Sequence, residues 1–208
     1  MDKIIKVKSI SIWIFIIPFL ALNICLIITT QFHSLIETPY RIHATFPYID
    51  GGVSISRTAR YFPTYLIFKP AMFLTSYFLI KYWLYNKEII NFFSKDHKYI
   101  NRILFFGIGS AILLTLHSIF LGVKFDYALY KLFRRVVMLS FIIFEVAAQT
   151  YLVLTLYSFK DKLVNYVNFK ILKLKLTLVS LLIIVAFVSI PFITLPGYKF
   201  FKHALEWD

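Results

Sequence analysis

The sequence has a single cysteine, Cys25, and few charged residues. A lone cysteine excludes a disulfide within the chain and any zinc or iron–sulfur site that needs several cysteines. Of the 208 residues, 60% are apolar and 16% are charged, so most of the folded surface must meet something other than water. This composition excludes a soluble globular protein and indicates a membrane protein.

Catalytic and cofactor-binding motifs are lacking as well. The sequence contains no H-E-x-x-H, no P-loop, no G-x-S-x-G and no cluster of histidines, so we expect no metal, no cofactor and no enzyme of these classes. Gly107-Ile-Gly109 has neither the preceding strand nor the third glycine of a nucleotide-binding fingerprint. Ser54 or Ser56 with His43 offers a nucleophile and a base, but any polar loop with these residue types offers the same.

Positive charge is in excess, with 23 Lys plus Arg against 10 Asp plus Glu and a net charge of +13. In a soluble protein this excess would suggest nucleic acid, whereas in a membrane protein basic residues mark topology and contact anionic lipids. We therefore expect membrane lipids as partners and no nucleic acid. The 17 Lys outnumber the 6 Arg, a bias that we interpret as the mark of an AT-rich, bacterial genome.

Five apolar stretches are long enough to cross a hydrocarbon core of about 30 Å as helices. They predict an all-α, polytopic membrane helix bundle that forms a single transmembrane domain over residues 1–208, without an internal repeat. The predicted spans are 10–30, 62–84, 103–123, 136–157 and 176–194, and the longest connection is the loop 31–61.

Basic residues predict the orientation of these spans. The N-terminus, residue 81 and the connections 85–102 and 158–175 carry 13 Lys plus Arg, whereas the loop 31–61, the connection 124–135 and the tail carry 9. The positive-inside rule then places the N-terminus in the cytoplasm and the loop 31–61 outside. We expect the inner, or plasma, membrane of a bacterium.

The outer loop holds the first candidate site. Pro47 to Gly52 predicts a rigid turn followed by a flexible one, with Asp50 at its centre, and Arg57 and Arg60 follow among three hydroxyl side chains. Guanidinium forks and hydroxyl groups together suit the phosphate of a lipid headgroup. The alternative is an ordinary polar loop in which the two arginines mark the membrane interface.

Polar residues inside the predicted spans extend this candidate site, because ionisable groups in a bilayer are costly. Lys69, His117 and Glu145 lie seven, six and nine residues from the outer ends of their spans, which is about 10, 9 and 13 Å at 1.5 Å per residue. Gln149 follows Glu145 by one turn on the same face. We expect Lys69 to pair with Glu145, near His117, in a polar cavity open to the outer leaflet. The alternative is that these residues join helices or extend to the interface.

The order of features resembles the DRAM/FRAG superfamily, which comprises damage-regulated autophagy modulators, the FGF-receptor-activating protein and GPI-anchor lipid-remodelling factors. The similarity lies in Pro47-x-Ile49-Asp50-Gly51 after the first span and in Tyr65 to Phe68 at the entry to the second. The family pattern is close to P-x-I-S-D-x-G, so the serine is missing here and the acid is shifted. The resemblance implies six spans and a role in lipid handling.

The tail from Lys202 to Trp207 looks like the polar entry to the family's final helix. We therefore expect a sixth span beyond residue 208, which would return the C-terminus to the cytoplasm. The alternative is a five-span protein whose tail lies outside.

Three functions fit these observations. The first is a lipid-binding or lipid-remodelling accessory protein that uses the outward-facing residues named above. The second is a small proton-coupled carrier in which Glu145 titrates and Lys69 or His117 modulates it. The third is a structural subunit whose small-residue and aromatic faces pack on a membrane-protein partner.

Overall fold

In the computed structural model, the described part of the chain consists of helices joined by turns and loops. The described residues are 2–37, 40–43, 45–94, 97–123, 127–163, 168–194, 203, 204 and 207. The helices in chain order are α1 (Asp2–Gln31), the 3-10 helix η1 (His33–Leu35), α2 (Pro47–Asp50), α3 (Ile55–Thr58), α4 (Tyr65–Phe93), α5 (Ile100–Phe120), α6 (Ala128–Ser158), α7 (Lys160–Leu163) and α8 (Phe169–Thr194).

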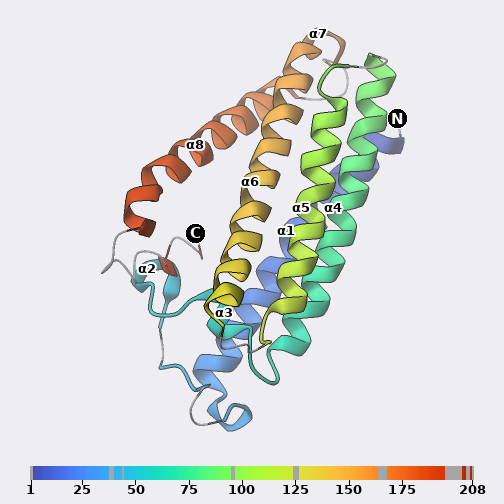
Figure 1. Ribbon diagram of the computed structural model, residues 1–208. Coiled ribbons are helices and arrows are strands. Elements are labelled where there is room, and N and C mark those ends of the chain that lie inside the picture. The colour runs from blue at the N-terminus through green and yellow to red at the C-terminus, as the bar shows by residue number, and fades with distance from the viewer. Residues whose placement is uncertain are drawn as a thin grey trace.

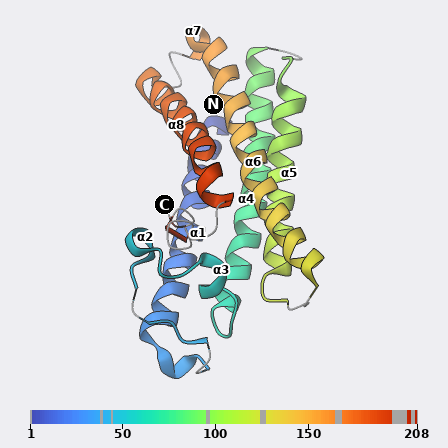
Figure 2. The ribbon, with the colours of Figure 1, turned by 60° about the vertical axis from the view of Figure 1, so that its left-hand side comes forward.

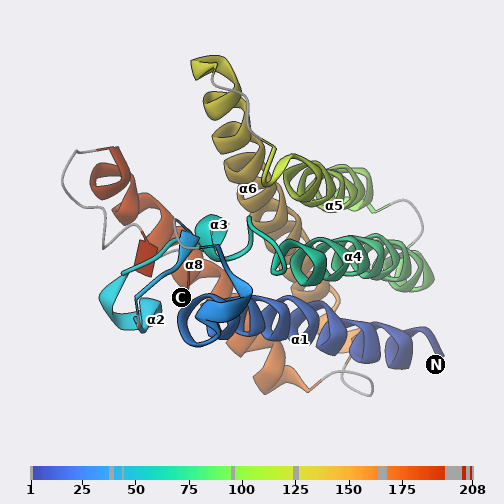
Figure 3. The ribbon, with the colours of Figure 1, turned by 90° about the horizontal axis from the view of Figure 1, so that it is seen from below.

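The five long helices pack mainly against their neighbours in the order α1, α4, α5, α6 and α8 (Figures 1 and 3). Consecutive long helices run in opposite directions, so the ends of α1 and α5 and the starts of α4 and α6 lie at one end of the molecule (Figure 1). We call this the loop end, because α2 and α3 also lie there. Helix α8 contacts α6 and then leans away from the row (Figures 1 and 2).

The outer faces of the row are apolar. Trp13, Phe15, Leu139 and Ile143 are each half or more exposed, which is the reverse of a water-soluble helix bundle. Among the described residues, three helical segments are long and apolar enough to cross a membrane. They are Lys3–Gln31, Ile100–Phe120 and Leu132–Ser158. Helix α4, which carries Lys69 and Lys81, is not among them, and the side chains of α8 are described only in part.

The core of the row lies where α4 meets α5. Trp83 of α4 is fully buried, and its ring lies against Gly107 of α5. A Cβ atom at residue 107 would come within 2.3 Å of the Trp83 ring, so only glycine allows this approach. Gly109, two residues further along, lies against Phe144 of α6. Gly107 and Gly109 of the third predicted span therefore serve close helix packing.

The predicted outer loop is structured. Helix α2 ends at Asp50 and is followed by Gly51, whose φ of 57° is the left-handed conformation that glycine adopts readily. The described tail residues close over this segment: the Trp207 indole donates to the Val53 carbonyl oxygen at 2.8 Å, and His203 Nδ1 to that of Gly51 at 3.1 Å. The rest of the predicted entry to a sixth helix, including Lys202 and Glu206, lies outside the described residues.

Candidate functional site

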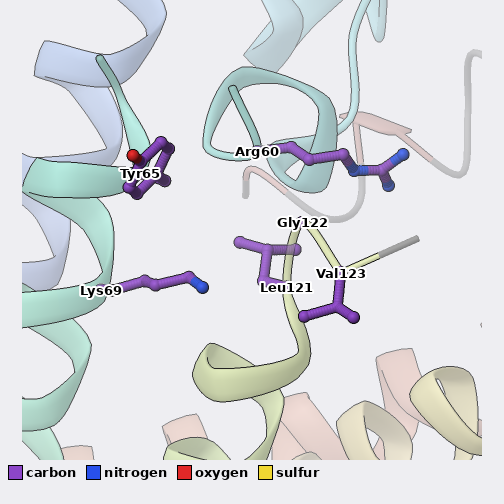
Figure 4. A pocket seen from close by; sticks show the side chains of 6 residues that line it. All are labelled: Arg60, Tyr65, Lys69, Leu121, Gly122 and Val123. Atoms are coloured by element: carbon purple, nitrogen blue, oxygen red, sulfur yellow. The ribbon is translucent and has the colours of Figure 1, made fainter. Parts of the chain in front are cut away.

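A pocket of about 240 Å³ opens at the loop end, where α4 begins and α5 ends. Arg60 reaches it from the segment between α3 and α4, while Tyr65 and Lys69 reach it from the first turns of α4 (Figure 4). The turn of Leu121, Gly122 and Val123 after α5 forms the remaining wall. Arg60 extends above this turn, and Lys69 points towards it from the opposite side (Figure 4).

The backbone of Arg60 lies close to the turn that follows α5. Gly122 has a φ of +89°, and a Cβ atom added there would lie 3.1 Å from the Arg60 carbonyl oxygen. The Nη2 group of Arg60 contacts the Ser56 hydroxyl at 3.5 Å, while its Nε atom is buried without a hydrogen-bond partner. A buried donor without a partner is costly, so Arg60 has capacity to bind an acceptor.

Two further basic side chains lie at the loop end but are not part of the pocket wall. Arg134 of α6 is close enough to Arg60 and to His117 of α5 for their charges to act on one another. The Nε atom of Arg134 and the Nδ1 atom of His117 are also buried without a hydrogen-bond partner. Three basic side chains from three segments therefore each bring one unsatisfied nitrogen to this end of the bundle.

Lys69 contributes a fourth basic group. Its ammonium donates to the Ile119 carbonyl oxygen at 3.3 Å and lies 5.9 Å from the centre of the Tyr65 ring. The described residues do not include 124–126, between α5 and α6. Among the residues that are described, the structure shows one ion pair, between Lys3 and Glu88. None of the four described basic groups at the loop end therefore pairs with a described acid.

The predicted pair of Lys69 and Glu145 is wrong. The Glu145 carboxylate is bonded to Ser110, which lies nine residues before Ile119 in α5, an axial separation of about 13 Å. The cause is the start of α6 at Ala128, eight residues before the predicted start at Val136. Glu145 is thus 17 residues, or about 25 Å, from the loop end of its helix.

Asp50 also has a role other than the one predicted. Both of its carboxylate oxygens accept from the Thr45 hydroxyl, at 2.6 and 2.7 Å, and the backbone N–H groups of Phe46 and Gly52 donate at 2.9 and 2.7 Å. These hydrogen bonds lower the pKa of Asp50 below its ordinary value, with the Thr45 hydroxyl as the largest cause. Asp50 therefore organises its own loop, and we leave it out of the proposed headgroup site.

The remaining predicted residues, Arg57 and Gln149, both lie outside the pocket. Arg57 lies exposed on α3 and is not part of the pocket wall. Gln149 lies with Glu145, as its spacing predicted, and its amide donates to Glu145 Oε1 at 2.8 Å. Of the predicted site residues, the loop end thus gathers Arg60, Lys69 and His117, while Glu145 and Gln149 form a separate pair deeper in the bundle.

The sequence analysis missed Arg134, Tyr65 and the turn 121–123 as site residues. The signal for Arg134 was present, because a short connection between two antiparallel helices brings the end of one beside the start of the next. Lys and Arg just before the fourth predicted span were interpreted only as topology markers.

The loop end has the chemistry of an anion-binding site. It offers guanidinium, ammonium, imidazole and phenol groups, which suit phosphate or carboxylate. Among the described residues, no group of His, Cys, Asp and Glu side chains is arranged to hold a metal ion. Comparisons of the chain with protein-family models, with curated proteins and with solved structures gave no match.

Proposed function

We propose that this protein is a five-span membrane protein that binds the anionic headgroup of a lipid in the pocket at its loop end. The observation that carries the proposal is the gathering of Arg60, Lys69, His117 and Arg134 without a described acid. The like charges of Arg60 and Arg134, which come from separate segments of the chain, repel, and the unpaired buried nitrogens add to the cost. An anion bound between them removes both costs.

The position of the pocket supports a lipid rather than a water-soluble anion. The described helices that surround it present apolar faces, and three helical segments are long enough to cross a bilayer. The pocket lies at the start of α4 and the end of α5, where helices that cross a bilayer would meet the lipid phosphates. A headgroup entering there leaves its acyl chains against the exposed apolar side chains.

The remaining parts of the proposal rest on the sequence. They are α4 and α8 as further spans, a bacterial inner membrane, a cytoplasmic N-terminus and a relationship to the DRAM/FRAG group. Of the two lysines of α4, Lys69 lies in the first turns of the helix, where its ammonium group can reach the nearby interface, whereas Lys81 lies close to the middle of the helix.

Native mass spectrometry of the detergent-purified protein tests the site. The probes are phosphatidylglycerol, phosphatidylcholine and inorganic phosphate, added separately and in competition. We expect selective retention of phosphatidylglycerol, with a loss of about tenfold or more in its affinity for Arg60→Gln, which removes a charge-assisted hydrogen bond from the pocket wall, and a smaller loss for Arg134→Gln, which removes a positive charge near Arg60.

Arg57→Gln is the matched control, because it removes an exposed arginine of the same loop that is not part of the pocket wall. Equal retention of phosphatidylglycerol by all three variants would show that the pocket is not a lipid site. Displacement of the lipid by millimolar inorganic phosphate would instead identify a site for a free anion.

A further inference from the structure

The hydroxyl group of Ser110 lies within hydrogen-bond distance of two other oxygen atoms. Its Oγ atom is 2.8 Å from the Gly107 carbonyl oxygen and 2.7 Å from Oε2 of Glu145. Both separations are within the range of a hydrogen bond between oxygens. A hydroxyl group carries one hydrogen, and a carbonyl oxygen can only accept, so the hydroxyl cannot supply both contacts.

The protonation state of Glu145 decides whether these contacts can be satisfied. If the carboxyl group is ionised, one proton serves two short oxygen–oxygen contacts, and the oxygens without a proton between them repel. If the carboxyl group is protonated, its O–H donates to Ser110 Oγ, and the Ser110 hydroxyl donates to the Gly107 carbonyl oxygen. Each short contact then has one proton, so the geometry matches the neutral acid.

The groups around Glu145 are compatible with a neutral acid. On its own helix, Gln149 donates an amide N–H to Oε1, and the opposite oxygen of that amide is buried without a partner. From α4, the indole of Trp83 lies beside the carboxyl group, although its N–H forms no hydrogen bond. Helix α5 presents Ser110, which carries no charge.

Helix α8 brings the one charged side chain that acts on Glu145 among the described residues, Lys175. The Lys175 ammonium donates to the Tyr82 hydroxyl of α4 at 3.2 Å and lies 5.9 Å from the centre of the Tyr82 ring. No ion pair joins Lys175 to Glu145 in the described part of the chain. The cation is therefore near enough to attract an ionised carboxylate but is bonded elsewhere.

We propose that Glu145 is a proton-binding site in the middle of the bundle, holding its proton at neutral pH through the Ser110–Gly107 relay. When the proton leaves to the medium, the carboxylate attracts the Lys175 ammonium away from Tyr82. Because α8 leans away from the other helices and meets α6, this attraction links the charge of Glu145 to the docking of α8 (Figures 1 and 2). This site is separate from the anion pocket, so either proposal can fail without the other.

Infrared spectroscopy of the purified protein in lipid nanodiscs at pH 7 tests the proposal. We expect the difference between wild type and Glu145→Gln to contain the carbonyl stretch of one protonated carboxylic acid. The matched control is Glu88→Gln, which removes a carboxylate paired with Lys3 and should remove only carboxylate bands. A wild-type minus Glu145→Gln difference with carboxylate bands alone would overturn the proposal.

Two further variants keep the test decisive if Glu145→Gln does not fold. Ser110→Ala removes the acceptor of the acid proton, so the protonated band should shift to higher frequency. Lys175→Gln removes the cation that favours the ionised form, so the band should persist to a higher pH than in the wild type. Absence of a protonated band at pH 7 in the wild type and in Ser110→Ala would refute the proton site.

Discussion

The carboxylate of Asp50 is exposed, yet it accepts hydrogen bonds from one side chain and two backbone groups of its own loop. These bonds favour the ionised form, and they account for the lowered pKa of Asp50. A carboxyl group whose pKa is lower in the folded state stabilises that state at pH values above its unfolded pKa. The contribution is lost as the pH falls through the folded pKa.

We therefore predict that Asp50→Asn loosens the loop at neutral pH. Hydrogen exchange of the Gly52 amide should become faster by about tenfold, because the amide loses a charged acceptor. In the wild type the same loosening should occur only when the pH falls through the lowered pKa of Asp50, which lies below the ordinary value of 3.8. Exchange in Asp50→Asn should follow only the intrinsic pH dependence of a free amide, and a further acid-induced loosening there would contradict this account.

The turn itself could be predicted from the sequence, but the partners of Asp50 could not. Pro47 and Gly51 indicate where α2 begins and ends, because proline suits a first turn and glycine a left-handed residue. The bond from Thr45 depends on the loop folding back over itself. A carboxylate that is fully engaged in this way cannot be told from a free ligand by its position in a sequence.

At the scale of the helix, the contact of α4 with α5 depends on residue 107 being a glycine, which has no side chain. The Trp83 ring occupies the position where residue 107 would carry a Cβ atom, and Trp83 is fully buried and unable to move aside. Gly109 is a control position on the same helix, because a Cβ atom there would meet Phe144, which is only partly buried.

We predict that Gly107→Ala destabilises the bundle by about 1–3 kcal/mol, the usual cost of overpacking a core. Gly109→Ala should cost less, because the Phe144 ring has room to turn away. Thermal unfolding of both variants in the same detergent measures the difference. Equal melting temperatures for the two variants would mean that Trp83 is not confined as described.

Helix ends were the weakest part of the sequence prediction. Each predicted span coincides with a long helix, and three of these helices contain segments apolar enough to cross a membrane. Helix α6 begins at Ala128, however, because Arg134 and Arg135 are tolerated inside a helix that extends past the apolar stretch. Because the predicted span leaves this extension out, it places Glu145 too near the loop end. The extension also brings Arg134 beside Arg60, a proximity that only the packing of α6 against α5 creates.

At the scale of the whole molecule, the proposed orientation makes a prediction about which end faces outwards. The loop end, with Ile49 of α2 at 82% exposure, should lie outside the cell, and the connection between α4 and α5, which contains Lys98, should lie inside. The native Cys25 is fully buried, so single cysteines introduced elsewhere can be labelled against a low background.

We expect Ile49→Cys to react with a membrane-impermeant maleimide in intact bacterial cells, and Lys98→Cys to react only after the membrane is permeabilised. The two sites lie at opposite ends of α4, a helix of 29 residues that spans about 43 Å, so the result also tests whether α4 crosses the bilayer. Labelling of both sites from outside would mean that α4 does not cross. The reverse pattern would place the anion pocket at the cytoplasmic leaflet. That leaflet also contains anionic lipids, and Arg60 and Arg134 would still attract them.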